Sequence, residues 1–223
     1  MARDALVERL EKLDACTVSD ALDRVGIKGA TLGIRPMWAC GRICGRAVTL
    51  KLKPQGDEKP TRHLGTEAIE AAEAGDVLVM ELSGRVDVPG WGGLLSLAAS
   101  TKGLAGIVID GACRDIDDSA AVKFPVYARA VVPITARGRV MQDTINEAIN
   151  FADITVTPGD YVVADGSGTI IVPQDRAEEV IAAGEDIAAR ETRMADAVRK
   201  GRSIVEIMET GGYEQMLDNE KKG

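Results

Sequence analysis

A group of charged side chains directly follows an apolar run that is typical of a buried strand. The nine residues DGACRDIDD, from Asp110 to Asp118, come straight after LAGIVI and hold one arginine among four carboxylates. Arg114 is a planar cation that can hold a carboxylate or a developing enolate. If a helix begins near Arg114, Asp115 and Asp118 lie three residues apart on one face of it. Two carboxylates completed by waters suit Mg²⁺ or Mn²⁺, so the segment predicts a site for a metal ion and an anionic substrate.

Helix capping is the alternative interpretation of the same acidic residues. Carboxylates in the first turn of a helix interact favourably with its dipole. Asp117 is expected to do only this, and Asp110 is expected to serve the turn. For Arg114 and Asp115 taken alone, the metal site and the helix start explain the pattern equally well.

A second segment that could bind a ligand is PGWGGLLSLAA, residues 89–99. Its glycines permit a close approach of the backbone to a ligand. A helix that begins near Gly93 would present the free N–H groups of Gly93, Leu94 and Leu95, which attract a carboxylate or a phosphate. Taken alone, the segment is more typical of an ordinary glycine-rich loop that enters a helix.

The elements around these two segments alternate between strands and helices. Apolar patterns and turn residues predict strands over 45–53, 76–82, 104–110, 125–132 and 168–173, and a strand–turn–strand over 153–165. Helices are predicted over 4–13, 17–26, 66–74, 94–103, 115–124 and 174–200. Thr17 or Ser19 would cap the second helix, and residues 83–93 are predicted to form a glycine-rich loop.

The alternation in the middle of the chain is typical of an α/β unit. Tight turns between the later strands favour antiparallel pairing, so we expect an α/β protein with a mixed β core and packed helices. No linker-like tract or internal repeat divides residues 1–223. We therefore expect one domain, with an N-terminal helix in residues 1–14 and a C-terminal helical segment in residues 174–223. Ligand sites in such sheets form beyond the carboxyl ends of strands, where both candidate segments lie.

The composition argues against several classes of function. The formal net charge of −8 does not suit general nucleic-acid binding, which needs a basic footprint. No run approaches the roughly 20 apolar residues of a transmembrane helix. The charged, amphipathic N-terminus is not typical of a signal peptide. We expect a cytoplasmic protein with no nucleic-acid or membrane partner.

The single histidine and the four cysteines limit the catalytic chemistry that is available. A Ser-His-Asp triad, a Cys-His pair or a two-histidine metal site would require His63, which we expect at the surface in a polar loop. Cys40 and Cys44 have a spacing that could suit metal or redox work. No second cysteine pair or nearby histidine completes a zinc site, so free buried thiols in a reducing cytoplasm are expected.

The two candidate segments combine into a longer motif. Gly93 is followed by 20 residues, then Arg114-Asp115, then two residues and Asp118. This G-x20-R-D-x2-D spacing resembles the motif of the RraA-like family, which includes class II pyruvate aldolases acting on 4-hydroxy-4-methyl-2-oxoglutarate and 4-carboxy-4-hydroxy-2-oxoadipate, and regulators of ribonuclease E. The resemblance covers roughly residues 15–200, through TVSDALD, CGRAVTLKL, FPVYARAVVP and VTPGDYVVADGSGTIIVP. It implies the RraA-like swivelling β/β/α sandwich.

The resemblance implies a role for each residue of the motif. Asp115 would anchor a divalent metal ion, Mg²⁺ or Mn²⁺, and Asp118 would support the hydrated ion. Arg114 would contact the keto oxygen of pyruvate and stabilise the enolate. Backbone amides of the GGLL stretch would hold the pyruvate carboxylate, and this stretch comprises Gly92, Gly93, Leu94 and Leu95.

The resemblance also implies features outside the motif. Glu191, in the C-terminal helix, would be the counterpart of a catalytic glutamate that a neighbouring subunit brings near the substrate. Family members assemble as trimers or hexamers, so a homotrimer or homohexamer is expected. Many family aldolases carry Asp or Glu where this chain has Gly93. Aldol cleavage would then be inefficient, or proton transfer would fall to water or to another carboxylate.

Several other charged residues are candidates for contact with the distal carboxylate of a substrate. These are Arg85, Asp87, Arg129, Arg137 and Arg139. Surface charge is the alternative for all five, and it is the favoured interpretation for the last three. Trp91 could line the pocket, although an aromatic side chain beside glycines is more often part of the packing.

The resemblance therefore predicts a metal-dependent lyase that cleaves a 4-hydroxy-2-oxo di- or tricarboxylic acid to pyruvate by a retro-aldol reaction. Decarboxylation of oxaloacetate passes through the same enolate, so one site could serve both reactions. The alternatives are an RraA-type regulator that binds a ribonuclease without aldolase activity, and a related metal-dependent reaction on another oxo acid or sugar acid. The intact R-D-x2-D set favours the enzyme because an interaction protein needs no metal framework, whereas Gly93 favours the regulator.

Overall fold

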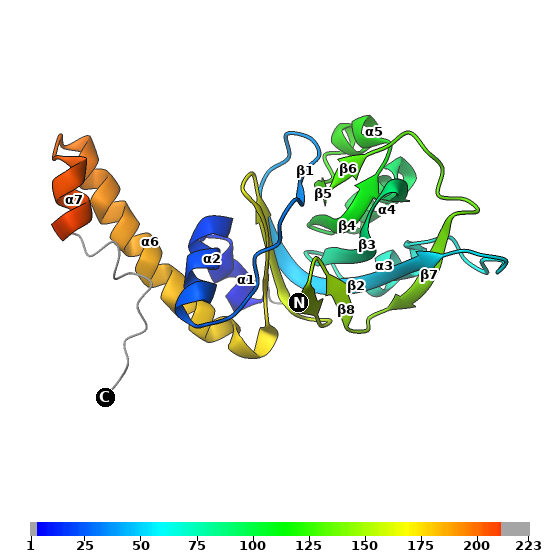
Figure 1. Cartoon of the computed structure of the whole chain (residues 1–223), viewed down its shortest axis with the longest axis horizontal. Coiled ribbons are helices and arrows are strands. Elements are labelled where there is room, and N and C mark those ends of the chain that lie inside the picture. The colour runs from blue at the N-terminus through cyan, green and yellow to red at the C-terminus, as the bar shows by residue number, and fades with distance from the viewer. Residues whose placement is uncertain (1–3, 211–223) are drawn as a thin grey trace.

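A mixed sheet of nine strands forms the centre of the chain in the computed structural model, which describes residues 4–210 (Figure 1). Its middle is made of four parallel strands, which are β2 (Ile43–Pro54), β3 (Val77–Trp91), β4 (Gly106–Cys113) and β5 (Val126–Ala128). An antiparallel hairpin extends the sheet beyond β2, and it consists of β10 (Tyr161–Asp165) and β11 (Gly168–Val172). The α/β class and the mixed β core predicted from the sequence are confirmed.

Shorter strands complete the edges of the sheet. β1 (Arg35–Pro36) pairs with β5, β6 (Ala130–Val131) pairs with β4, and β7 (Val140–Ile145) pairs with β2. β8 (Ile149–Phe151) and β9 (Ile154–Val156) form a separate antiparallel pair. The prediction that β9 and β10 form one strand–turn–strand unit is wrong in its pairing, because each strand has its own partner elsewhere.

Three helices connect the parallel strands in turn. They are α3 (Thr66–Ala71), α4 (Gly93–Lys102) and α5 (Ile116–Ala121). The predicted start of α4 at Gly93 is confirmed, and Gly103 ends the helix in the left-handed conformation that glycine adopts easily. Trp91 at the end of β3 pairs with Cys113 at the end of β4. The starts of α4 and α5 therefore lie beside each other at one edge of the sheet.

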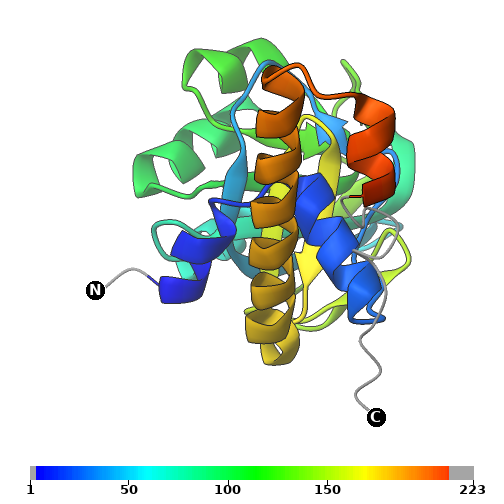
Figure 2. The same ribbon diagram turned by 90° about the vertical axis from the view of Figure 1, so that its left-hand side faces the viewer.

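A second group of helices covers the β10–β11 hairpin. Figure 2 shows α6 (Ala177–Arg199) between α1 (Ala5–Leu10) and α2 (Ala15–Arg24), and α7 (Ile204–Thr210) at its far end. A short 3-10 turn, Gln174–Arg176, precedes α6. Residues 1–3 and 211–223 of the predicted terminal segments lie outside the described residues. Within residues 4–210, no helix combines the length and apolarity that a bilayer crossing requires.

The cap of α2 differs from the predicted one. Asp14 is the N-cap residue, and its Oδ1 accepts a hydrogen bond from the backbone N–H of Thr17 at 2.8 Å. Neither Thr17 nor Ser19 caps the helix, because the helix begins at Ala15, before both of them. A carboxylate near the free N–H groups of a first turn satisfies the same requirement.

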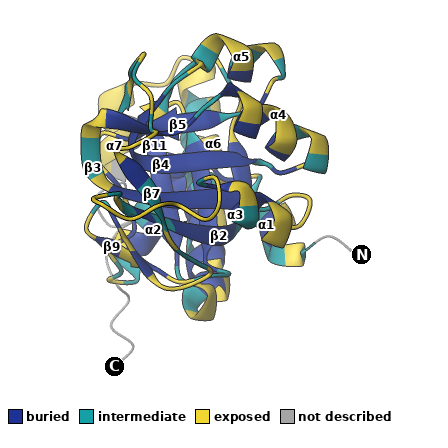
Figure 3. Ribbon diagram, turned by 90° about the vertical axis from the view of Figure 1, so that its right-hand side faces the viewer, coloured by how far each residue is buried: buried dark blue, intermediate teal, exposed yellow. Residues whose placement is uncertain are grey.

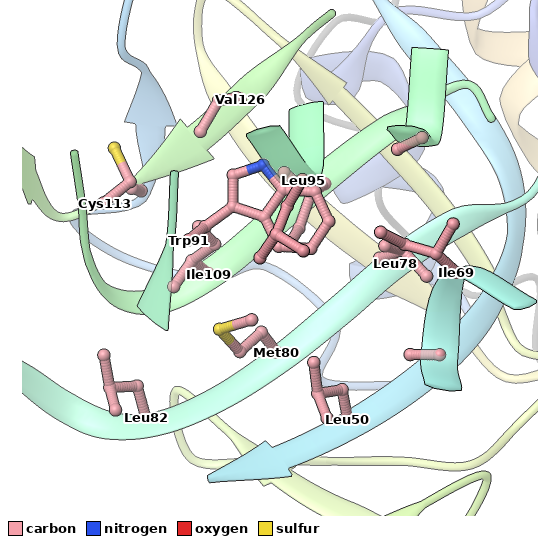
Figure 4. Close-up of a cluster of buried hydrophobic side chains, with 14 of the residues drawn as sticks. Leu50, Ile69, Leu78, Met80, Leu82, Trp91, Leu95, Ile109, Cys113 and Val126 are labelled. Atoms are coloured by element: carbon pink, nitrogen blue, oxygen red, sulfur yellow. The ribbon is translucent and has the colours of Figure 1, made fainter. Parts of the chain in front are cut away.

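Figure 3 shows the strands at the centre of the sheet as largely buried. One face of them packs on α3 and α4, and the other packs on β8, β9 and the inner face of the β10–β11 hairpin, whose outer face α1, α2 and α6 cover. One core cluster lies between the sheet and α3 and α4, and it includes Leu50, Leu78, Met80, Trp91 and Leu95 (Figure 4). Trp91 stacks on Phe124 with ring centroids 6.1 Å apart. Its Nε1 donates to Ser96 Oγ at 2.9 Å, and Ser96 Oγ lies 2.7 Å from Ser119 Oγ. This hydrogen-bonded chain fixes α4 and α5 against the end of β3.

The predicted glycine-rich loop over residues 83–93 is wrong for most of its length. β3 continues as an extended strand to Trp91, and its pairing with β4 shifts register after Glu81, after Arg85 and after Pro89. Ser83 and Gly84 have positive φ values of 52° and 70°, which mark the first irregularity. Bulges of this kind let a strand turn and still keep its partner. The strand therefore places Gly92 directly beside Arg114.

Candidate functional site

A cavity of about 1060 Å³ opens at the carboxyl ends of β3 and β4. Part of its lining comes from residues 89–95 and from Arg114 and Asp115. Ala98 also lines it, and the remainder comes from two segments that are distant in sequence, within residues 55–70 and 135–141. The structure thus brings the two candidate segments together at the edge of the sheet where ligand sites form in α/β proteins.

The start of α4 presents backbone donors to this cavity. Gly92 is extended, with φ −154° and ψ 179°, and it supplies no side-chain cap. The N–H of Gly93 is directed at Asp115 Oδ2, 3.3 Å away. The N–H groups of Leu94 and Leu95 have no acceptor among the described residues, as expected for a first turn. All four residues of the GGLL stretch line the cavity, so an anion could accept from these amides.

Three hydrogen bonds hold Arg114 in place, one through its backbone N–H and two through its guanidinium. Its N–H donates to the carbonyl of Trp91 at 2.9 Å, which continues the pairing of β4 with β3. Its Nε donates to Asp115 Oδ1 at 3.0 Å, and its Nη1 donates to the carbonyl of Ile134 at 3.0 Å. These bonds use part of the donor capacity of the guanidinium, and the rest is available to a ligand in the cavity.

Asp115 adopts a left-handed backbone conformation, with φ 54° and ψ 45°. It is the N-cap residue of α5, which begins at Ile116 and not at Arg114. The prediction that Asp115 and Asp118 share a helix face is therefore wrong in its geometry. Non-glycine residues adopt this conformation rarely, and such strain gathers at functional sites. Here it turns the Asp115 carboxylate back toward the start of α4.

Asp118 reaches the same place from the first turn of α5. A Cβ built on Gly93 would lie 2.7 Å from both Cβ and Oδ2 of Asp118, and one built on Gly92 would lie 2.9 Å from Asp115 Oδ2. The two carboxylates thus meet over two consecutive glycines, each of which leaves room for one of them. Asp117 also lies in the first turn of α5, where its charge suits the helix dipole.

Asp110 has a different role from the predicted one. It lies inside β4, is 5% exposed, and does not serve a turn. Its Oδ1 accepts from Arg129 Nε at 2.5 Å, and its Oδ2 accepts from the N–H of Ala152 at 3.2 Å. The ion pair ties β4 to the residue between β5 and β6, and the bond from Ala152 ties it to the segment after β8. Asp110 does not line the cavity.

Glu191 is not brought to the cavity within one chain. It lies on α6, in the helical group that packs against the β10–β11 hairpin, and it is not among the residues that line the cavity. Burial, together with the charges of Asp14 and Asp20, raises the pKa of its carboxyl above the usual range. A contribution of Glu191 from a neighbouring subunit stays a prediction.

The loop between β2 and α3 was not recognised as part of a site from its sequence. His63, which was expected only at the surface, is exposed and lines the cavity with Arg62. Its Nδ1 lies 3.0 Å from the carbonyl of Leu64. The polar composition of this loop carries no periodic signal, and its position depends on packing against α3 and β7. Trp91 both lines the cavity and belongs to the core.

Two carboxylates could hold a metal ion here. Within the described part of the chain, no group of three or more His, Cys, Asp or Glu side chains is arranged around one point. Asp115 and Asp118 converge without a third ligand of these types, and both are exposed. Such a donor set suits Mg²⁺ or Mn²⁺, because these ions are often bound through one or two carboxylates and keep several waters. Cys16, Cys40, Cys44 and Cys113 form no disulfide in the described structure.

Comparison with known proteins identifies the family to which this chain belongs. The model of the RraA-like family, described as Aldolase/RraA, matches residues 15–171. A protein of Halalkalibacterium halodurans named "putative 4-hydroxy-4-methyl-2-oxoglutarate aldolase" is 30% identical over 206 residues, which cover 91% of this chain and 94% of that protein. DlpA of Legionella pneumophila is 29% identical over 210 residues, or 94% of this chain. The chain spans only 34% of the length of DlpA and 60% of that of MJ0644 of Methanocaldococcus jannaschii.

Solved structures agree with the sequence comparison. An uncharacterized protein of Pseudomonas syringae pv. tomato has a TM-score of 0.82 and 31% identity, covering 91% of this chain and 96% of that one. Streptomyces coelicolor RraAS2, titled an unusual member of the RNase ES inhibitor RraA protein family, has a TM-score of 0.77 and 26% identity. That match covers 86% of this chain and 96% of RraAS2.

Proposed function

The chain belongs to the RraA-like family, and we propose that it is a metal-dependent lyase that cleaves a 4-hydroxy-2-oxo di- or tricarboxylic acid to pyruvate. The observation that carries this proposal is the position of Arg114 and Asp115. Both lie at the carboxyl end of β4, in the same cavity as the free amides of the α4 start. The aldolase name of the Halalkalibacterium relative supports the reaction class.

The reaction needs a group that holds the C1 carboxylate, a positive charge at the C2 oxygen, and an acceptor for the proton of the C4 hydroxyl. The C3–C4 bond breaks, its electron pair moves to the C2 oxygen as a pyruvate enolate, and the C4 hydroxyl loses its proton to become a carbonyl. The amides of Leu94 and Leu95 would hold the C1 carboxylate. Arg114 would donate to the C2 oxygen as negative charge develops there. Donors that are already in position stabilise such charge without reorganisation.

Asp115 and Asp118 are the residues that would hold the metal ion. A bound Mg²⁺ or Mn²⁺ supplies Lewis-acid polarisation of the keto oxygen. Because Asp115 Oδ1 is bonded to Arg114, the arginine also fixes the carboxylate that would bind the ion. The same enolate chemistry extends the proposal to decarboxylation of oxaloacetate.

Asp118 would also take over the proton transfer that an acidic residue at position 93 would serve. Its carboxylate lies where the side chain of residue 93 would begin. It could order a water that accepts the proton of the C4 hydroxyl and later returns one to C3 of the enolate. Glu191 would assist from a neighbouring subunit of a homotrimer or homohexamer. We propose a cytoplasmic setting for this activity.

Similarity to RraAS2 favours one alternative function. That structure is titled as a member of an RNase ES inhibitor family, and it shares the fold across 86% of this chain. A regulator of this kind would bind a ribonuclease through its surface and would need no turnover. The presence of Gly93 in place of an acidic residue is compatible with it.

Pyruvate release tests the proposal directly. The substrates are 4-hydroxy-4-methyl-2-oxoglutarate, 4-carboxy-4-hydroxy-2-oxoadipate and oxaloacetate, each with Mg²⁺, Mn²⁺ or EDTA. We expect turnover that EDTA abolishes, and a loss of about 10²–10³-fold in Arg114→Met. Asp115→Asn should also lose turnover, whereas Asp117→Asn, an exposed neighbour in the first turn of α5, should not. Absence of turnover on all three substrates would reject the lyase and leave ribonuclease inhibition as the next assay.

A further inference from the structure

Arg137 differs from the other arginines that line the cavity. Arg62 forms an ion pair with Glu67, and Arg114 binds Asp115 and a backbone carbonyl. Arg137 is exposed and lines the cavity, and its guanidinium has no hydrogen-bond or ion-pair partner among residues 4–210. A guanidinium presents five donors in a planar arrangement that matches a carboxylate. These donors are therefore available to an anion in the cavity.

The backbone around Arg137 is fixed on both sides. Before it, the carbonyl of Ile134 accepts from Arg114 Nη1 at 3.0 Å. After it, the N–H of Gly138 donates to Gln55 Oε1 at 3.1 Å, and the carbonyl of Arg139 accepts from the N–H of Gln55 at 3.1 Å. The backbone that carries the Arg137 side chain is therefore already fixed before a ligand binds. Binding then orders the side chain alone, and it loses less conformational entropy than it would if the loop also had to be ordered.

The other arginines considered for a distal carboxylate are engaged elsewhere. Arg85 binds both oxygens of Asp87, at 3.0 and 2.8 Å. Arg129 binds the buried Asp110, and Arg139 Nη1 donates to the carbonyl of Thr135 at 3.1 Å. None of these three lines the cavity. Arg137 is the one member of this group that the described structure leaves able to contact a ligand there.

The size and charge of the cavity suit a ligand larger than pyruvate. Its volume of about 1060 Å³ slightly exceeds the roughly 300–1,000 Å³ that is typical of small-molecule sites. The protein as a whole has a net charge of −8 and repels a dianion. Arg62, Arg114 and Arg137 line the cavity together with Glu70 and Asp115, and Arg137 is the one of these arginines without a carboxylate partner among the described residues.

We propose that Arg137 is a specificity-determining residue that binds the second, distal carboxylate of a 2-oxo acid. The first carboxylate would accept from the amides at the start of α4, as in the proposed function on which this inference rests. The cavity then selects dicarboxylic 2-oxo acids over monocarboxylic ones. His63, on the loop between β2 and α3, lines the same cavity and is not required for this selection.

Calorimetric binding of two acids that cannot be cleaved tests this selection. The acids are 2-oxoglutarate, which has the distal carboxylate, and 2-oxobutyrate, which lacks it, each titrated with Mg²⁺ present. Arg137→Met should weaken 2-oxoglutarate binding on the order of tenfold and leave 2-oxobutyrate unchanged, because a charge-assisted hydrogen bond is lost from one acid only. Arg137→Lys should retain part of the preference. The matched control Arg139→Met should change neither acid.

The outcomes separate this inference from the proposed reaction. Equal weakening of both acids, no weakening, or no binding of either acid overturns the role of Arg137. Loss of the preference in Arg137→Met, in a chain that releases no pyruvate from any hydroxy-oxo acid, supports the subsite and rejects the aldolase. The third outcome is that Arg137→Met cleaves substrate with the same ratio of kcat/KM for 4-hydroxy-4-methyl-2-oxoglutarate over 4-hydroxy-2-oxopentanoate as the native chain. This outcome supports the aldolase and rejects the subsite.

Discussion

The side chain of Asp118 occupies the space in which a side chain at Gly93 would begin. A Cβ at Gly93 would lie 2.7 Å from Cβ and 2.7 Å from Oδ2 of Asp118, closer than real Cβ contacts come. The space between the two positions holds only one side chain. In this protein Asp118 of α5 occupies that space, and position 93 of α4 has no side chain. An acidic side chain at position 93 would therefore have no room beside Asp118 as it lies here.

The first prediction concerns the coupling of these two positions. Gly93→Asp should lower the free energy of unfolding by about 1–3 kcal/mol, the usual cost of overpacking. Asp118→Gly removes both atoms that crowd position 93, so the double variant should recover most of that loss. Urea unfolding of the four proteins forms a double-mutant cycle that measures the coupling. Simple additivity of the two changes would contradict the shared volume.

A second prediction concerns the buried hydrogen bond of Trp91. Ser96→Ala leaves the indole N–H without its acceptor, because Ser96 Oγ lies 2.9 Å from Nε1. An unsatisfied buried donor costs about 1–3 kcal/mol, so the urea midpoint should fall clearly. Thr101→Ala, on the exposed side of the same helix, should change stability by less than about 0.5 kcal/mol. Similar effects of the two substitutions would argue against a specific role of the serine.

The thiols should differ sharply in reactivity. Burial raises the pKa of Cys113, which precedes Arg114, to about 12, so this thiol stays protonated at pH 8. Cys16 is exposed on α2. With a disulfide reagent at pH 8, the folded protein should show a fast reaction that Cys16→Ser abolishes. Cys113 should react only after unfolding, and rapid labelling of it in the folded protein would show that the end of β4 opens.

The stability of the chain should respond to pH through Glu191. Its pKa is raised in the folded state by burial and by Asp14 and Asp20, so folding favours the protonated form. The favourable contribution is fully present below the unfolded value of about 4.5 and is lost as pH rises through the folded pKa. Glu191→Gln should therefore be more stable than the native chain at pH 7, with no such advantage at pH 4. Urea unfolding at the two pH values measures this, and a less stable variant at pH 7 would contradict the sign.

Local patterns in the sequence account for the parts of the site that depend on short stretches of chain. The apolar run before Asp110 predicted a strand, and the glycines before Leu94 predicted a helix that begins at Gly93; both are confirmed. The position of Arg114 at the end of this strand follows from the same pattern. These features need only hydrophobic periodicity and the conformational preferences of a few neighbouring residues.

Other features depend on contacts between distant segments and could not be predicted. Helical spacing placed Asp115 and Asp118 on one face, but Asp115 precedes the helix in a left-handed conformation that its partners Arg114 and Gly93 stabilise. β3 keeps its pairing through a glycine-rich stretch because β4 lies beside it. His63 and Arg137 meet at one cavity only because the loops before α3 and before β7 pack on the same edge.

The support of Arg114 has a consequence for how such proteins diverge. Its Nη1 is anchored by the carbonyl of Ile134, a backbone group that every amino acid provides. The first turn of α4 likewise offers main-chain amides. Under the proposed roles, mutations in the segment around Arg137 would alter which molecules are accepted, while Arg114, which would face the reacting atoms, keeps its anchor. Selection would thus be able to change ligand choice and the proposed bond-breaking chemistry separately, on one inherited scaffold.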